Sequence, residues 1–163
     1  KFPIGITVSH CKYYTIKFLS PYSNNLNHST REGNYVLFVR QGNTLILSGH
    51  IPSTPNGLLK GKLGSNLSIE EGYRSARTCA INILATLQSE LGTLDRVKRI
   101  IKIVGFVNCT DDFEQQPAVI NGASDFFVEV FGEKGQHARS AVGSNALPLG
   151  IATEVECIVE IEG

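Results

Sequence analysis

The sequence has no excess of charge of either sign, no paired cysteine motif and no long apolar run. Fifteen Lys and Arg residues balance fifteen Asp and Glu residues, so the chain has no overall field that would attract a phosphate backbone. The four cysteines are far apart and form neither a CxxC motif nor a Cys/His cluster of metal-ligand spacing. No run approaches the roughly 18 apolar residues of a membrane span. These absences disfavour nucleic-acid binding, a metal centre and a membrane protein.

The composition predicts one globular domain preceded by an extension. Of the 163 residues, 42% are hydrophobic and 18% are charged, which suits an apolar core. Residues 1–31 differ, because they hold four basic residues and no acid before Glu32. This bias resembles an organellar transit peptide, although Lys stands where such peptides favour Arg. An N-terminal extension is the preferred interpretation, since two short segments within it have the pattern of pairing strands.

The expected division is therefore an N-terminal extension over 1–31 and a globular domain over 32–163. The expected cellular location depends on whether residues 1–31 are an extension or a transit segment. We expect a cytoplasmic protein, or one of an organelle (mitochondrion or plastid) if residues 1–31 are a transit segment. Cys79 and Cys157 fall in apolar periodic segments, so both are expected to be buried, reduced thiols.

Hydrophobic periodicity predicts two helices and five main strands, in addition to one short edge strand. Two apolar runs around Gly42-Asn43 indicate a β-hairpin. Ser68 and Glu71 form a capping box at the start of a helix that Gly92 ends. The continuously apolar run 98–109 predicts a central strand, and residues 58–64 a short edge strand. The expected bounds are strands over 35–40, 44–50, 98–109, 138–143 and 153–162, and helices over 69–91 and 112–131.

This β-β-α-β-α-β-β order predicts an α+β fold in which two helices pack on one face of a mixed sheet. Two charges fall in its last two strands, where the flanking residues are apolar. Arg139 shares a strand face with Ala141 and Gly143, small residues that leave room for a guanidinium. Glu154, at the start of the last strand, is expected to face the same cavity. A buried unpaired charge is strongly unfavourable, so the partner of Arg139 is either Glu154, in a structural salt bridge, or a ligand carboxylate.

Three segments resemble the YjgF/RidA family of small trimeric imine deaminases, also described as endoribonuclease L-PSP or translation inhibitors. They are YVLFVRQGNTLILSGHIP, GFVNCTDDFEQQPAVINGASDFFVEVFGE and HARSAVGSNALPLGIATEVECIVEIE. The resemblance covers roughly residues 33–162 and is strongest to a branch other than the family archetype. It implies a chorismate-mutase-like unit whose sheets form the central barrel of a homotrimer. It also implies ligand sites in clefts between subunits and no metal or organic cofactor.

The resemblance also implies roles for six residues of this chain. Arg139 corresponds to the arginine that holds the ligand carboxylate, which a guanidinium does with two parallel hydrogen bonds. Ser48 and Gly49 correspond to a serine-glycine pair whose backbone contacts the ligand. Tyr35 corresponds to the family's aromatic site residue, and Asn121 to an asparagine on the second helix.

Glu154 corresponds to the acid that positions the attacking water, a role worth about 10²–10⁴-fold in rate. The leading hypothesis is hydrolysis of reactive enamines or imines, such as 2-aminoacrylate, to 2-oxo acids and ammonia. RNA cleavage or translation inhibition, and non-catalytic binding of a small carboxylate, are the alternatives.

The chain departs from the archetype at two places. Ala141 stands where the archetype has a cysteine, which removes cysteine chemistry from the expected site. His50 stands where it has glutamine, and a surface or capping histidine is expected there.

Overall fold

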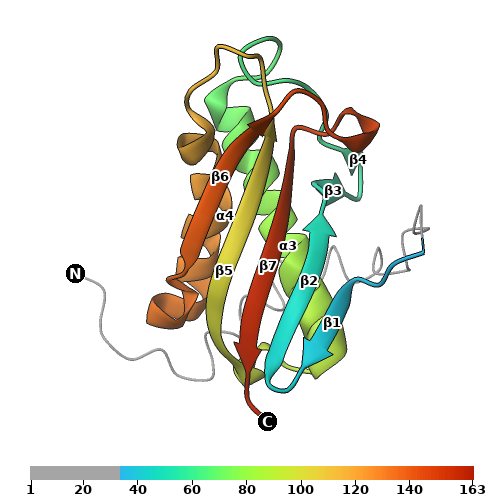
Figure 1. The fold of residues 1–163 in the computed structure, drawn as a ribbon, viewed down its shortest axis with the longest axis vertical. Helices are drawn as coiled ribbons and strands as arrows, with labels where there is room; N and C mark the ends of the chain where they lie inside the picture. Colours follow the sequence, from blue (N-terminus) through green and yellow to red (C-terminus); the bar gives the residue numbers. More distant parts are fainter. Residues whose placement is uncertain (1–33) are drawn as a thin grey trace.

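A computed structural model describes residues 34–163 of the chain, so the expected extension over 1–31 lies outside the described residues. The described part holds two long helices, a large sheet and a small hairpin (Figure 1). The strands are β1 (Phe38–Gln41), β2 (Thr44–His50), β3 (Ser53–Thr54), β4 (Gly57–Leu58), β5 (Val97–Asn108), β6 (Ala138–Ser144) and β7 (Thr153–Ile161). The helices are α3 (Ile69–Leu91), α4 (Gln116–Phe131) and the short 3₁₀ turns η2 (Leu94–Arg96), η3 (Gly132–Gly135) and η4 (Pro148–Gly150).

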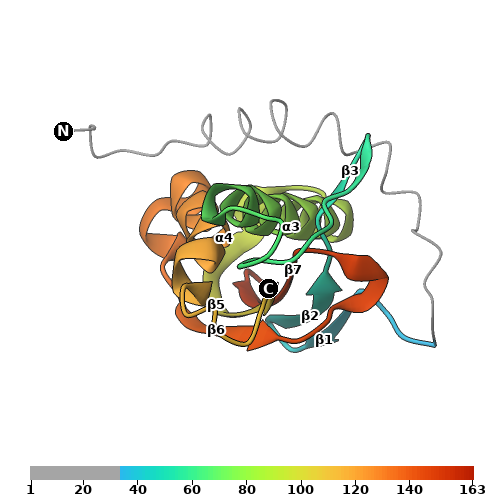
Figure 2. The same cartoon turned by 90° about the horizontal axis from the view of Figure 1, so that it is seen from above.

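The five-stranded sheet has the order β1-β2-β7-β5-β6. Only the β5–β6 pair is parallel. Helices α3 and α4 cover one face and leave the other open, as Figure 2 shows from above. The predicted α+β architecture, with two helices on one face of a mixed sheet, is therefore confirmed.

Helix α3 begins and ends where the sequence predicts. The Ser68 backbone N–H donates to Glu71 Oε2 (2.8 Å), and the Glu71 N–H donates to Ser68 Oγ (3.2 Å). This capping box satisfies donors that the first helical turn leaves unpaired. Gly92 is the C-cap. Cys79 lies on the buried face of this helix and is fully enclosed in the core, as is Cys157 on β7.

Helix α4 begins at Gln116, four residues later than predicted. Pro117 is the physical reason, because a proline is tolerated in the first turn but would break a helix that had begun at residue 112. The four residues expected to face inward are fully buried: Val119, Ala123, Phe127 and Val130. A Cβ at Gly122 would collide with the Tyr73 carbonyl, so this glycine allows α3 and α4 to pack closely.

Residues 58–64 do not add an edge strand to the main sheet, and that prediction is wrong. Residues 57–58 pair instead with β3 in a separate two-stranded hairpin. The segment beyond it only bridges single residues, Lys60 to Ile151 and Leu63 to Cys109. The apolar run 98–109, in contrast, becomes β5, which pairs with a neighbour on each side.

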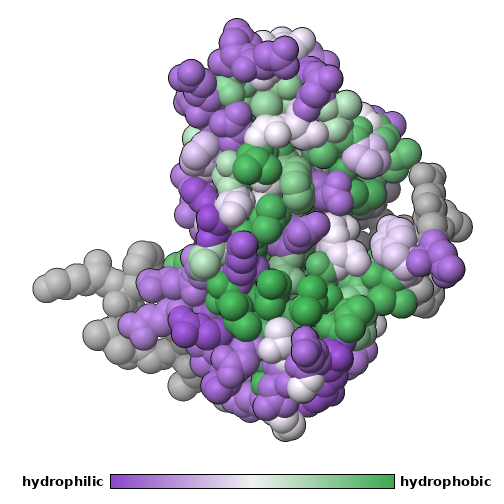
Figure 3. Space-filling view, viewed as in Figure 1, coloured by the Kyte–Doolittle hydropathy of each residue, from purple (hydrophilic) through white to green (hydrophobic). Residues whose placement is uncertain are grey.

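The open face of the sheet carries apolar side chains among polar ones (Figure 3). The most exposed are Val39, Ile46, Ile101 and Val142, each between 38% and 56% exposed. Neighbours such as Leu45, Leu47 and Ile100 are buried under the helices, so both faces of the sheet are partly apolar. An apolar face of this kind is typical of a surface that another protein chain covers.

Candidate functional site

Arg139 lies near the start of edge strand β6, on the face that carries the helices. Its Nη1 donates to Asn121 Oδ1 (2.8 Å) and to Ser124 Oγ (3.1 Å), both on α4. Asn121 and Ser124 are three residues apart and so share one face of the helix. The structure therefore brings together Arg139 and Asn121, two of the residues predicted for the site.

The guanidinium of Arg139 is anchored at one nitrogen. Among the described residues both of its hydrogen bonds go through Nη1, which leaves the Nε–Nη2 edge without a protein acceptor there. No carboxylate pairs with it in residues 34–163, where the ion pairs are Arg77–Glu129 and Lys98–Glu160. The Nε and Nη2 hydrogens point side by side, and this geometry matches the two oxygens of a carboxylate.

Glu154 lies in β7 on the opposite, open face of the sheet. Val155 and Cys157 point to the helices and are buried, so the alternating Glu154 and Glu156 point away from them. A Cβ at Gly49 would collide with Glu154 Oε1, so the missing side chain makes the space that this carboxylate occupies. Burial, and then the charge of Glu156, raise the pKa of Glu154 above its ordinary value.

The expectation that Glu154 faces the same cavity as Arg139 is wrong within one chain. Strand β5 lies between β6 and β7, and the two side chains are on opposite faces of the sheet. A structural Arg139–Glu154 salt bridge is therefore absent from the described residues. The room expected beside Gly143 is also filled, because a Cβ there would touch Cys109 Sγ at 2.9 Å and Gln116 Nε2 at 3.1 Å.

Ser48 and Gly49 lie in a bulge of β2, where the register with β7 shifts. The Ser48 hydroxyl donates to the Val36 carbonyl (2.6 Å), which ties the segment before β1 to this bulge. Tyr35 lies in that segment, three residues before β1 begins, and is 52% exposed. The predicted strand over 35–40 therefore starts at Phe38, and Tyr35 lies outside it.

His50 is buried, so the expectation of a surface or capping histidine is wrong. Its Nδ1–H donates to the Ser48 carbonyl (2.7 Å), and its Nε2 lies 2.9 Å from Thr86 Oγ1. A carbonyl only accepts, so Nδ1 bears the hydrogen, and Nε2 of the neutral ring accepts from Thr86. Burial lowers the pKa of His50 to about 4. The neutral ring fixes the bulge from the core side.

Two groups of residues thus stand apart on the molecule. The Arg139 cluster consists of Arg139, Asn121, Ser124 and His137, and the Glu154 cluster consists of Ser48, Gly49, His50 and Glu154. Ser124 and His137 were not among the residues predicted for the site. Both had a signal, because Ser124 follows Asn121 by about one helical turn, and His137 precedes Arg139 by two residues, directly before β6.

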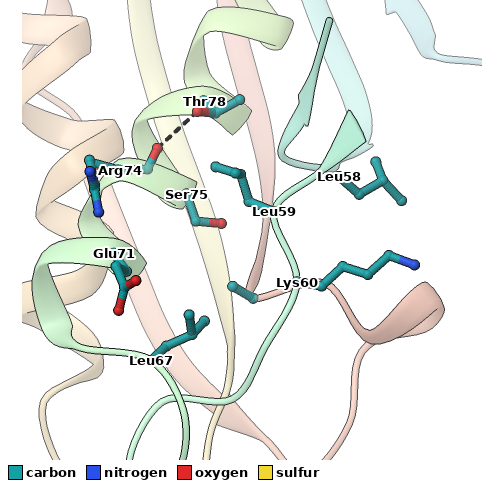
Figure 4. A pocket seen from close by; sticks show the side chains of 9 residues that line it. Leu58, Leu59, Lys60, Leu67, Glu71, Arg74, Ser75 and Thr78 are labelled. Atoms are coloured by element: carbon teal, nitrogen blue, oxygen red, sulfur yellow. Dashed lines mark hydrogen bonds between the residues drawn. The ribbon is translucent and has the colours of Figure 1, made fainter. Parts of the chain in front are cut away.

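The structure also has an open cleft of about 480 Å³ beside the first half of α3 (Figure 4). None of the six predicted site residues lines it. It is lined by Leu58, Leu59, Lys60 and Leu67, by Glu71, Arg74, Ser75 and Thr78 of α3, and by Ala152. Within residues 34–163 no group of three or more His, Cys, Asp or Glu side chains could hold a metal ion. No helix in this range is long and apolar enough to cross a membrane.

Comparison with known protein families gives one match that spans most of the chain. The family model described as "YjgF/chorismate mutase-like, putative endoribonuclease" matches residues 25–161. The chain belongs to the YjgF family. The resemblance deduced from the three sequence segments is therefore confirmed, and so is the chorismate-mutase-like fold.

Several relatives of this YjgF-family protein are similar over most of their length. Protein TCP17 of Trypanosoma cruzi is 46% identical over 130 residues, which are 78% of this chain and 81% of that protein. The crystal structure of Atu1372, a protein of unknown function from Agrobacterium tumefaciens, is 35% identical with a TM-score of 0.80, covering 95% of this chain and 99% of that one. A structure from Shewanella oneidensis, described as a putative endoribonuclease, is 32% identical with a TM-score of 0.77, covering 80% and 87%.

Proposed function

We propose that this protein hydrolyses small carboxylate-bearing enamines or imines, such as 2-aminoacrylate and 2-imino acids, to 2-oxo acids and ammonia. The observation that carries the proposal is the state of Arg139. Its guanidinium is held at Nη1 by neutral groups of α4, and its Nε–Nη2 edge has no carboxylate among the described residues. A cation positioned in this way is suited to an anionic ligand.

The Glu154 cluster supports the chemical step. Water adds to the C=N carbon while Glu154 takes one of its protons, and that proton then passes to nitrogen. In the resulting carbinolamine, Glu154 takes the hydroxyl proton and passes it to the amino nitrogen as the C–N bond breaks, so that ammonia leaves, the carbonyl of the 2-oxo acid forms and the carboxylate is restored. Burial raises the pKa of Glu154 above its ordinary value, which makes the carboxylate a better base.

The two clusters are proposed to meet between copies of the chain. Within one chain they lie on opposite faces of the sheet, so one chain alone does not bring Arg139 and Glu154 to a single small ligand. The open face with Val39, Ile46 and Val142 exposed offers an apolar surface that a homotrimer would bury. In that assembly Arg139, with Asn121, faces Glu154, Ser48 and Gly49 of the next copy. Tyr35, tied to Ser48 through Val36, stays a candidate ligand contact.

Subunit mixing tests the composite site directly. Arg139→Ala and Glu154→Gln variants are refolded together in equal amounts, and 2-oxo acid formation from a freshly generated imino acid is followed by absorbance. Each variant alone should be inactive. In random trimers about a quarter of the sites combine an intact Arg139 with an intact Glu154 from the neighbouring copy, so about a quarter of wild-type activity should return.

The matched control mixes wild type with the Arg139→Ala/Glu154→Gln double variant. A composite site again leaves about a quarter of the activity, whereas a site within one chain leaves about half. No recovery in the first mixture, together with half activity in the second, would refute the composite site. A monomeric mass by sedimentation at micromolar concentration would do the same.

Two other functions are outcomes of the same assays. A protein that only binds small carboxylates would retain Arg139-dependent affinity for 2-oxobutyrate without accelerating imine hydrolysis. Endoribonuclease is the activity that the family description and the Shewanella structure name. Such a protein would degrade single-stranded RNA, and neither the wild type nor Arg139→Ala would accelerate imine hydrolysis. The balanced charge of the chain weighs against the second.

A further inference from the structure

His137 is a half-buried histidine whose two ring nitrogens both have partners. Its Nδ1–H donates to the Gly135 carbonyl (2.6 Å), and this carbonyl can only accept. Burial and then the nearby charge of Arg139 lower the pKa of His137, which the Gly135 hydrogen bond offsets only in part. The ring is therefore neutral at pH 7, with its hydrogen on Nδ1 and a free electron pair on Nε2.

Ser124 connects this histidine to Arg139. Ser124 Oγ lies 3.1 Å from His137 Nε2 and 3.1 Å from Arg139 Nη1. An arginine only donates, so Ser124 Oγ accepts from Nη1 and its hydroxyl hydrogen goes to Nε2. Each hydrogen bond has one possible direction, from Arg139 through Ser124 and His137 to the Gly135 carbonyl.

The far end of this chain of hydrogen bonds is rigidly held. The His137 ring packs edge-on against Phe127, with centroids 5.9 Å apart and planes at 87°. Phe127 is fully buried in α4, and Ser124 lies one turn before it on the same helix. Arg139, in contrast, is exposed and has a long, flexible side chain. The rigidly held His137 and Ser124 can therefore restrict the orientation of the flexible Arg139 side chain.

We propose that Ser124 and His137 are positioning residues that hold the Arg139 guanidinium ready for the ligand carboxylate. Asn121 holds the same nitrogen from the neighbouring turn. Fixing Nη1 leaves the Nε–Nη2 edge presented outward before the ligand arrives, so less side-chain freedom is lost on binding. The inference rests on the proposed function, in which Arg139 binds that carboxylate.

The test combines single variants with a double-mutant cycle. Calorimetric titration with 2-oxobutyrate gives Kd, and imine hydrolysis gives kcat and KM. Ser124→Ala should raise Kd and KM about five- to tenfold while kcat changes less than about twofold, because the carboxylate contact is made in both ground and transition states. Ser124→Thr keeps the hydroxyl and should restore Kd to within about twofold of wild type.

His137→Leu supplies the second arm of the cycle. On its own it should raise Kd several-fold, because Ser124 loses the acceptor for its hydrogen. In the Ser124→Ala background it should raise Kd no further, since the connection is already broken. A purely structural role for His137 would predict equal effects in both backgrounds, and melting curves of all four proteins report that role separately.

The outcomes separate this inference from the proposed function. If Arg139→Ala abolishes binding while Ser124→Ala and His137→Leu leave Kd unchanged, or act additively, the positioning role is overturned and the proposed function stands. If wild type does not bind 2-oxobutyrate, or Arg139→Ala binds it as wild type does, both are overturned.

Discussion

The Arg139 cluster and the Glu154 cluster are built in opposite ways. Arg139 is exposed at a sheet edge and is held by neutral groups of α4, one of which is bonded in turn to His137 just before β6. Glu154 is half-buried on the open face, next to a second acid and against the bare backbone of Gly49. The Arg139 guanidinium is therefore exposed to solvent, whereas the Glu154 carboxylate is partly shielded from it.

This difference has an energetic consequence. An exposed cation that keeps its solvation costs the fold little, so it can be positioned by a few neutral hydrogen bonds. A carboxylate with a raised pKa is destabilising whenever it is ionised. Replacing Arg139 is therefore expected to reduce activity without changing stability. Replacing Glu154 is expected to reduce activity and to increase stability. Four variants test this contrast.

The largest effect is expected for Arg139→Ala. Losing two charge-assisted hydrogen bonds of roughly 1.5–3 kcal/mol each should weaken 2-oxobutyrate binding by about 100-fold or more and eliminate imine hydrolysis. The melting temperature should hardly change, because the side chain is exposed. Arg139→Lys should restore little, since an ammonium cannot make the paired contact. Retained affinity with a much lower melting temperature would show that Arg139 is structural.

Glu154→Gln should lower kcat about 100-fold or more and yet stabilise the fold at pH 7. Because burial raises its folded-state pKa, the ionised carboxylate destabilises the protein above the pKa of the unfolded chain, and protonation relieves this as pH falls. The gain in melting temperature should therefore be present at pH 7 and shrink toward pH 4. Wild-type turnover in this variant would rule out the water-positioning role.

His50 should give the protein a marked acid sensitivity. Its folded-state pKa of about 4 lies below its ordinary value of 6.5, so the unfolded chain binds more protons between these values. Unfolding free energy should fall by up to about 3 kcal/mol as the pH drops from 6.5 to 4. His50→Gln should lose this component, which denaturant titrations of both proteins at pH 7, 5.5 and 4 will measure. Parallel pH profiles would contradict the assignment.

The smallest effect is expected for Gly49→Ala, with a loss of about tenfold in kcat/KM. The added Cβ would occupy the place of Glu154 Oε1 and displace the carboxylate. In a Glu154→Ala background the same change should have no further effect, because nothing remains to collide with. An equal loss in both backgrounds would mean that Gly49 acts through the strand backbone alone.

Much of the fold could be predicted from local patterns. The capping box at Ser68, the stop at Gly92 and the four inward residues of α4 are encoded by spacing over a few residues. The helix α4 begins later than predicted because Pro117 is tolerated only in the first turn of a helix, which places the start at Gln116. The edge strand predicted over 58–64 is wrong because an apolar run does not specify its pairing partner, and residues 57–58 pair with β3 instead.

The candidate site was predictable in its residues and not in its arrangement. Strand alternation correctly separates Glu154 from the buried Val155 and Cys157, and it places Arg139 with Ala141. It does not show whether β6 and β7 are neighbours. The crossover that makes β6 parallel to β5 puts β5 between them, and this turned an expected common cavity into two separate clusters.

The sequence by itself determined the elements, the buried faces of the helices and the family, because each depends on short-range spacing or on residue identity along the chain. Only the tertiary structure decided which side chains meet. Arg139 contacts Asn121 and Ser124, and Ser124 contacts His137, because α4 packs beside β6, and Glu154 lies against Gly49 because β2 bulges opposite β7. These contacts join residues 13 to 105 positions apart, and such distances are closed by packing of the core rather than by any local pattern.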